Sequence, residues 1–230
     1  MNYFYSSSVM GYGFGRKWHY KYDFPYLPRV TKTLTLGAIT GIPFAIIKFG
    51  KSVWNRVGLH NIGLTEWLYR YRNRVELHDV IVSLAGTDAE ISIITIILQD
   101  YDIAGIELNF SCPNHKSFKN IKVPNKIINK HPIYLKLSYD QDPYEYDLND
   151  VAGIRLNSVP CVVGGLSGKA ARAKNWAFIE QFNREGLNVA GCSFVDNYDL
   201  LCLKDLGCKE IGIGSTILTN PHLIEHLPIM

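Results

Sequence analysis

The sequence lacks the paired cysteines that bind metals or exchange electrons. It has 5 cysteines, an odd number, and no two of them form a C-x-x-C pair. Zinc ribbons, iron–sulfur proteins and thiol–disulfide oxidoreductases use that spacing, so we expect no metal site. Reduced thiols are typical of the cytoplasm, where we expect the protein to reside.

Long apolar runs are also missing. The longest candidate, residues 34–47, is interrupted by Gly37, Gly41 and Pro43 and is too short to cross a membrane. Residues 1–15 have neither the charged start nor the apolar core of a signal peptide. We therefore expect a soluble protein with no membrane partner.

An excess of charge of one sign is absent as well. The 24 lysines and arginines nearly balance the 21 aspartates and glutamates, giving a net charge of +3. The local cluster of Arg70, Arg72 and Arg74 is typical of a solvated helix face. Nucleic-acid-binding proteins need a dense basic stripe, so we expect no nucleic-acid partner. The 230 residues, 47% hydrophobic and 20% charged, predict one globular domain spanning residues 1–230.

What the sequence does contain is a series of short β-rich runs, each followed by a helical or loop segment. Several runs are continuously apolar, as buried parallel strands require. The eight predicted strands are residues 3–8, 29–36, 79–85, 105–110, 132–138, 153–157, 187–191 and 210–214.

Helices are predicted between several of these strands. Thr87 and Glu90 have the spacing of a capping box, and the apolar residues that follow recur on one helix face. Two further helices are predicted over residues 169–185 and 196–206, each ended by a glycine.

This alternation of strands and helices predicts an α/β fold. Eight strands favour a closed (β/α)8 TIM barrel, with an open doubly wound sheet as the alternative. The glycines of residues 11–15 do not have the G-x-G-x-x-G spacing that would support the open sheet. Because such barrels usually need ~250 residues, we expect a compact barrel with short loops and helices. Residues 139–151 leave little room for a helix.

Polar side chains end several of the predicted strands. Reactive groups of such barrels project from the C-terminal strand ends, so these side chains are expected to meet at one mouth. For a strand lysine the alternative is a surface side chain that extends to solvent, for an asparagine a turn or cap, and for a cysteine an inert buried thiol. The candidates are Lys32, Asn109, Cys112, Asn114, Lys136 and Asn157.

Six motifs, in order along the chain, resemble those of the class 1 dihydroorotate dehydrogenases. The turn at 164–168 resembles class 1B catalytic subunits in particular. The motifs are residues 6–13, 30–35, 55–61, 107–114, 164–168 and 213–216, and the segment 107–114 reads Glu-Leu-Asn-Phe-Ser-Cys-Pro-Asn.

The resemblance implies oxidation of dihydroorotate to orotate in de novo pyrimidine biosynthesis, with FMN as hydride acceptor. It implies Cys112 as the catalytic base, and asparagine amides suit the alternating donors and acceptors of a pyrimidine edge. A lysine beside the flavin pyrimidine favours the anionic reduced cofactor. The implied substrate contacts are Lys32, Asn55, Gly58, Leu59, Asn109, Asn114, Asn157 and Ser158. The implied FMN contacts are Ser7, Ser8, Lys32, Thr33, Asn109, Lys136, Gly164, Gly165, Cys192, Ser193, Gly214 and Ser215.

The sequence departs from the family pattern at several positions. Cys192 and Ser193 stand where the family has paired glycines, Ser8 replaces another glycine, and Ser83 replaces an asparagine that many relatives carry. The chain is also shorter than the family after Asn114 and before the turn at 164–168. A compact enzyme and a degenerate, non-catalytic flavin-binding or partner-binding relative are both compatible with these changes.

Two further questions stay open at the level of sequence. A flavodomain like that of dihydropyrimidine dehydrogenases is an alternative enzyme, because it also uses a cysteine. The partners implied by the resemblance are the small-molecule substrate, a second copy in a homodimer, and a subunit carrying FAD and an iron–sulfur cluster. The electron acceptor is fumarate, such a partner subunit, or another molecule.

Overall fold

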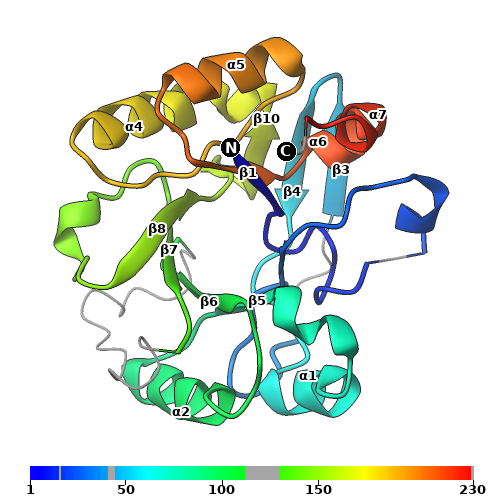
Figure 1. Cartoon of the computed structure of the whole chain (residues 1–230), viewed down its shortest axis with the longest axis vertical. Coiled ribbons are helices and arrows are strands. Elements are labelled where there is room, and N and C mark those ends of the chain that lie inside the picture. The colour runs from blue at the N-terminus through cyan, green and yellow to red at the C-terminus, as the bar shows by residue number, and fades with distance from the viewer. Residues whose placement is uncertain (16, 41–44, 112–129, 229–230) are drawn as a thin grey trace.

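The computed structural model describes residues 1–15, 17–40, 45–111 and 130–228. Its centre is a parallel sheet in the order β11-β1-β2-β5-β6-β7-β8 (Figure 1). Each neighbouring pair in that order is parallel. The strands are β1 (Asn2–Tyr5), β2 (Arg29–Val30), β5 (Val80–Leu84), β6 (Gly105–Asn109), β7 (Ile133–Leu137), β8 (Val151–Leu156) and β11 (Glu210–Ile213).

Residues 188–191 close this sheet into a barrel. Val189 forms a parallel bridge with Ile154 of β8, and Gly191 forms one with Ile211 of β11. The Ala190 N–H donates to the Ile154 carbonyl at 2.8 Å, which ties the segment to β8. All eight predicted runs therefore lie in the barrel wall, and the predicted (β/α)8 fold is confirmed over the open sheet.

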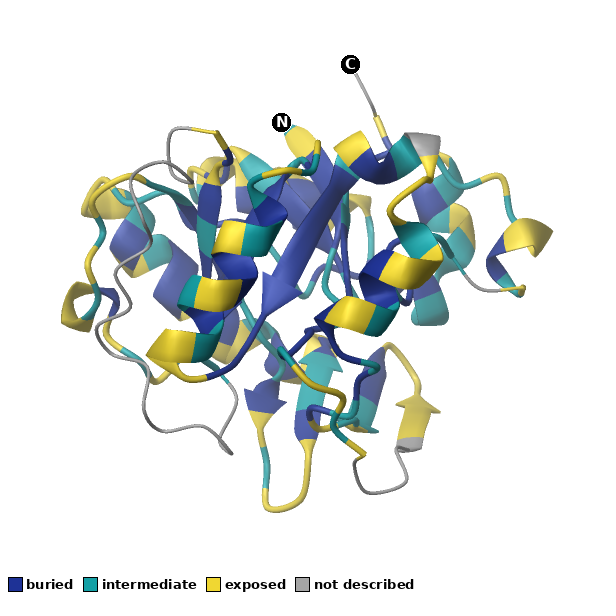
Figure 2. Cartoon of the chain, turned by 90° about the horizontal axis from the view of Figure 1, so that it is seen from below, coloured by how far each residue is buried: buried dark blue, intermediate teal, exposed yellow. Residues whose placement is uncertain are grey.

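The strands are buried on both sides. Outward side chains such as Val82 and Leu84 pack in a large apolar core, while Phe4, Val30 and Ile81 form a separate inner cluster. Figure 2 shows buried central strands beneath helices that expose their outer faces. The helices are α1 (Leu64–Tyr71), α2 (Asp88–Leu98), α4 (Arg172–Arg184), α5 (Asn197–Asp205), α6 (Thr216–Thr219) and α7 (Pro221–Glu225).

Local sequence signals explain where the predicted helices begin and end. Thr87 Oγ1 accepts from the Glu90 N–H, and Glu90 Oε2 accepts from the Thr87 N–H at 2.7 Å, so the predicted capping box starts α2. Gly186 and Gly207 adopt φ values of 92° and 81° just after α4 and α5, which confirms them as terminators. Short 3-10 helices complete the set: His19–Lys21, Val75–Asp79, Pro143–Glu145 and Lys169–Ala171.

Two details refine the sequence-based expectations. The connection between β7 and β8 holds only the 3-10 helix Pro143–Glu145, as its length predicted. The basic cluster is not one helix face, because α1 ends at Tyr71 with Arg72 as its C-cap and Arg74 beyond it. Among the described residues, no helix combines the length and apolarity needed to cross a membrane.

A second sheet, which the sequence patterns did not predict, joins two barrel loops. It is antiparallel with the order β3-β4-β10-β9. Two of its strands follow β2 and the other two follow β8, so it links the C-terminal ends of two separate barrel strands. The strands are β3 (Ala45–Phe49), β4 (Ser52–Arg56), β9 (Val159–Pro160) and β10 (Gly165–Gly168).

Candidate active site

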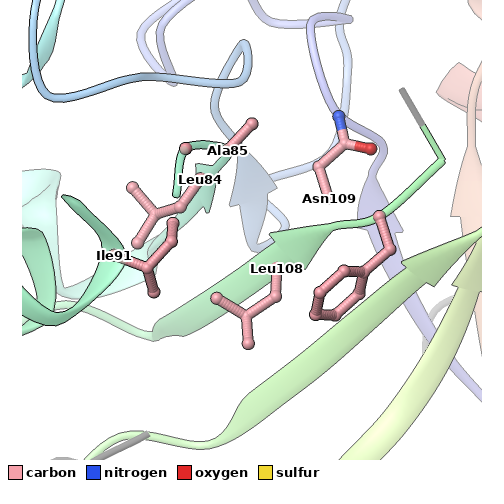
Figure 3. Close-up of a pocket in the computed structure, with 7 residues that line it drawn as sticks. Leu84, Ala85, Ile91, Leu108 and Asn109 are labelled. Carbon is pink, nitrogen blue, oxygen red and sulfur yellow. The ribbon is translucent and has the colours of Figure 1, made fainter. Parts of the chain in front are cut away.

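The C-terminal mouth of the barrel brings together three predicted residues, Thr33, Asn109 and Lys136. Asn109 Nδ2 donates to Thr33 Oγ1 at 2.9 Å, and its Oδ1 accepts from Ser111 Oγ at 2.7 Å. Lys136 of β7 is the register partner of Asn109. Figure 3 shows the Asn109 amide leaving β6 on the side opposite Leu108, which lies in a small hollow with Ile91 and Leu84. Asn109 is therefore held toward the barrel interior.

Beneath this mouth lies a buried ionic network that was not predicted. Glu107 Oε1 accepts from Ser83 Oγ at 2.8 Å and lies 4.0 Å from Lys136 Nζ. Its Oε2 lies 3.6 Å from a guanidinium nitrogen of Arg155. The other terminal nitrogen of Arg155 lies 3.7 Å from Glu210. Two cations and two carboxylates thus compensate one another inside the barrel, as buried charges require.

Arg155 is also fixed by aromatic rings. Its guanidinium carbon lies 4.0 Å from the Phe4 ring centroid and 3.7 Å from that of Tyr134. Burial of the Tyr134 hydroxyl, reinforced by Glu210, raises its pKa above the ordinary value. The sequence signal for this network was a charged residue inside each of three predicted strands: Glu107, Lys136 and Arg155.

The predicted flavin-contacting segment after β1 lies against the end of β2. Ser7 Oγ donates to the Thr31 carbonyl at 2.9 Å, and the Lys32 N–H donates to the Gly11 carbonyl at 2.7 Å. Ser8 has a φ of 72°, a left-handed conformation that favours glycine. Ser8 thus adopts a backbone conformation that glycine would adopt without strain.

Four predicted residues meet in the second sheet. Asn55 Nδ2 donates to the Gly165 carbonyl at 3.3 Å. A Cβ atom at Gly164 would lie 2.3 Å from the Asn55 carbonyl oxygen, and one at Gly165 would lie 2.4 Å from Ser158 Oγ. The pair Gly164 and Gly165 thus permits close packing between loops. Asn157 ends β8, where its N–H donates to the Leu137 carbonyl at 2.9 Å.

Gly58 and Leu59 follow β4 in the same loop. Gly58 has a φ of 58° and is exposed, whereas the Leu59 side chain is buried. The backbone of Gly58 is therefore accessible from solvent, whereas the buried side chain of Leu59 fixes the loop to the core.

The turn after β11 offers an anion-binding arrangement. A Cβ atom at Gly214 would meet nothing within 4 Å, so there is open space beside it. Within the described part of the chain, the backbone N–H groups of Gly214, Ser215 and Thr216 make no hydrogen bond. A Cβ atom at Gly168 would lie 2.5 Å from the Lys51 carbonyl oxygen and 3.1 Å from Ser215 Oγ. Gly168 was missed by sequence reasoning; its signal was its place immediately before a helical segment.

The replacement of paired glycines by Cys192 and Ser193 is accommodated by neighbours on α4. Ser193 has a φ of 62°, again in the left-handed region. Asn175 Nδ2 donates to Ser193 Oγ at 3.0 Å and to Cys192 Sγ at 3.4 Å, and Trp176 Nε1 donates to the Cys192 carbonyl at 2.8 Å. Burial raises the pKa of the Cys192 thiol to about 11, so it is neutral at physiological pH.

The proposed base, Cys112, and Asn114 lie outside the described residues. Among the residues that are described, no group of three or more histidine, cysteine, aspartate or glutamate side chains is arranged to hold a metal ion.

Comparisons with known proteins agree with this architecture. No protein-family model matches the chain. The dihydroorotate dehydrogenase B (NAD(+)) catalytic subunit of Malacoplasma penetrans is 24% identical, covering 92% of this chain and 82% of that protein. The subunit of the same name from Bacillus pumilus is 25% identical, covering 94% of this chain and 84% of that protein.

Solved structures extend the agreement to the fold. The crystal structure of a DHODH from Eimeria tenella in complex with ferulenol superposes with a TM-score of 0.66 at 13% identity, covering 98% of this chain and 79% of that one. The ligand-free structure from the same organism gives 0.65 at 14% identity, covering 86% and 74%. Over most of its length the chain is thus similar to dihydroorotate dehydrogenase B (NAD(+)) catalytic subunits at 24–25% identity, and it shares the (β/α)8 barrel fold of the solved DHODH structures.

Proposed function

We propose that this protein oxidises dihydroorotate to orotate in pyrimidine biosynthesis, using FMN. The observation that carries the proposal is the polar set at the barrel mouth, where Asn109, Thr33 and Lys136 meet although a buried core needs none of them. The names of the curated relatives support the same reaction.

The residues of the mouth fit a flavin phosphate. The open space beside Gly214 and the N–H groups of residues 214–216 supply room and donors for an anion. Gly168 allows its backbone to approach Ser215 closely, so we place Gly168 in the phosphate turn and assign Gly164 and Gly165 to loop packing instead. Ser193, held by Asn175, completes this side of the mouth.

The remaining roles follow from the chemistry of the side chains. FMN, when bound, supplies the acceptor for the hydride that leaves C6 of dihydroorotate. Cys112 removes the proton from C5, and Lys136 places a positive charge beside the pyrimidine end of the flavin. Amide groups orient the pyrimidine by donating to and accepting from its edge, and Lys32 adds a cation to that site. The proposed amide set is Asn55, Asn109, Asn114 and Asn157.

Purified protein tests the proposal directly. We expect a yellow preparation, or a colourless one that takes up FMN. Anaerobic addition of dihydroorotate should bleach the flavin absorbance, whereas dihydrouracil should not. Bleaching by dihydrouracil alone would favour the dihydropyrimidine-dehydrogenase-like alternative, and protein that takes up no FMN would exclude both enzymes.

The Cys112→Ala variant tests the base. It should retain FMN yet lose flavin reduction by dihydroorotate by about two to four orders of magnitude, the usual contribution of a general base. Reduction at the wild-type rate would show that another group takes the proton.

We further propose that the protein is cytoplasmic. We also propose that electrons leave the reduced flavin through a second subunit, because the curated relatives are named catalytic subunits of an NAD(+) enzyme. Fumarate reduction by the isolated chain would contradict that route. Sedimentation of the purified chain tests the proposed homodimer.

A further inference from the structure

We propose that Glu107 is a positioning residue that couples Lys136 at the mouth to Arg155 in the barrel interior, and that this buried charge set tunes the redox preference of the flavin. The inference rests on the proposed function, because it requires FMN to lie beside Lys136. Glu107 and Arg155 have no part in the proposed reaction itself.

The carboxylate of Glu107 serves both cations at once. Its Oε1 atom lies 4.0 Å from Lys136 Nζ, and its Oε2 atom lies 3.6 Å from Arg155. The three side chains are nearly inaccessible, with 2% of the Glu107, 11% of the Lys136 and 5% of the Arg155 side-chain surface exposed. Charges so poorly screened by water interact strongly at these distances. A change of charge beside one carboxylate oxygen of Glu107 therefore alters the electrostatic energy of the cation beside the other.

The Arg155 side chain cannot readily move when Glu107 is substituted. Its guanidinium lies against the rings of Phe4 and Tyr134, and its far nitrogen faces Glu210. It acts as a fixed charge, and Glu107 is the carboxylate shared between that fixed charge and the lysine of the mouth.

A chain of hydrogen bonds through two uncharged hydroxyl groups connects the same carboxylate to Asn109, the proposed substrate-reading residue. Glu107 accepts from Ser83, the Ser83 hydroxyl is 3.0 Å from Thr33 Oγ1, and Thr33 accepts from Asn109. Glu107 and Asn109 lie two residues apart on β6 and thus on one face. The effect of removing a charge, at Glu107, can therefore be measured separately from the effect of removing a hydrogen bond, at Ser83.

The coupling predicts effects of opposite sign. Glu107→Gln removes a negative charge and makes the electrostatic potential at the mouth more positive, which favours the anionic reduced flavin. Arg155→Gln removes a positive charge and lets Glu107 compensate Lys136 more fully, which disfavours the reduced flavin. A merely structural network would weaken FMN binding in both variants without this reversal of sign.

The test is an anaerobic titration of the FMN-loaded protein against redox dyes. Glu107→Gln should raise the ratio of affinities for reduced over oxidised FMN roughly tenfold, which raises the midpoint potential by about 30 mV for a two-electron couple. Arg155→Gln should lower the ratio by a similar factor. Ser83→Ala is the matched control, because it removes the hydrogen bond to Glu107 but no charge, and its potential should stay at the wild-type value.

A second variant covers the case in which an interior substitution prevents folding. Glu210 is 23% exposed at its side chain, and Glu210→Gln should raise the potential, by less than Glu107→Gln. Shifts of one sign in both the glutamate and arginine variants, or a Ser83→Ala shift equal to that of Glu107→Gln, would overturn the coupling while leaving the enzyme assignment intact. Wild-type protein that binds no FMN would overturn both.

Discussion

Replacing Asn175 with alanine should loosen the turn at Cys192 and Ser193. The variant loses two hydrogen bonds, to Ser193 Oγ at 3.0 Å and to Cys192 Sγ at 3.4 Å. At about 1 kcal/mol net for the first and less for the second, the free energy of unfolding should fall by about 1–2 kcal/mol. The Oδ1 atom of Asn175 is buried and accepts no hydrogen bond from the described residues, so its removal offsets part of this loss.

Glycine at position 193 is the informative second change. Ser193→Gly relieves a left-handed conformation that costs an L-residue about 1–2 kcal/mol, but it also loses the hydrogen bond from Asn175. The two effects nearly cancel, and we expect a net change within about 0.5 kcal/mol. Without the serine hydroxyl, Asn175→Ala should then cost only about 0.5 kcal/mol.

A double-mutant cycle measures this coupling. Urea denaturation of the four apo-proteins should give an interaction energy of about 1 kcal/mol, and fluorescence titration should show a larger loss of FMN affinity for Asn175→Ala alone than in the glycine background. An equal effect of Asn175→Ala in both backgrounds would refute the role of Asn175 in holding the turn.

Three other predictions concern the same mouth. Gly214→Ala should leave the free energy of unfolding within about 0.5 kcal/mol of wild type but weaken FMN binding at least about tenfold, or 1.4 kcal/mol, because its methyl group fills the open space. Gly168→Ala should instead destabilise the apo-protein by about 3 kcal/mol, since its φ is 71° and Lys51 is in the way; unchanged urea denaturation would contradict this. Between pH 9 and 11 the unfolded chain releases the Cys192 proton before the folded one does, so stability should fall by roughly 2 kcal/mol at 1.36 kcal/mol per pKa unit. Denaturation curves of Cys192→Ala should lack this part of the alkaline loss.

The barrel was predictable because the apolar residues within each strand indicate that the strand is buried. The strands within the runs at 79–85 and 105–110 are mostly apolar and buried throughout, and they pair in the expected order. The seventh predicted run, at 187–191, appears only as isolated bridges, yet it occupies the expected position in the wall. The number of predicted strands therefore indicated a closed barrel, although the ends of individual strands were predicted less accurately.

The second sheet was not predictable from local pattern, because its central strands are far apart in the chain. Asn55 of β4 pairs with Gly165 of β10, 110 residues later. Nothing in the residues around Gly165 distinguishes a strand from a phosphate-binding turn, so the strand β10 was not predicted. Pairing of distant segments is decided by tertiary structure, not by local propensity.

The ionic network was missed for a related reason. A charged residue such as Arg155 within a strand is usually exposed, and its partners Glu107 and Glu210 lie on strands distant in sequence. Conversely, the site residues on strand ends were predictable, because every barrel strand delivers its C-terminal end to one mouth. Asn109, Thr33 and Lys136 meet for that reason.

The pairing of β1 with β11 has a consequence for folding during translation. Asn2 is aligned with Glu210, so the first strand of the barrel lies beside the last. At ~5–20 residues per second, about 10–40 s of translation separate these residues, and β1 has an open edge until β11 emerges. Arg155 likewise leaves the ribosome well before Glu210 does. Until then only Glu107 is available to pair with Arg155, and the nascent chain must shield the open edge of β1.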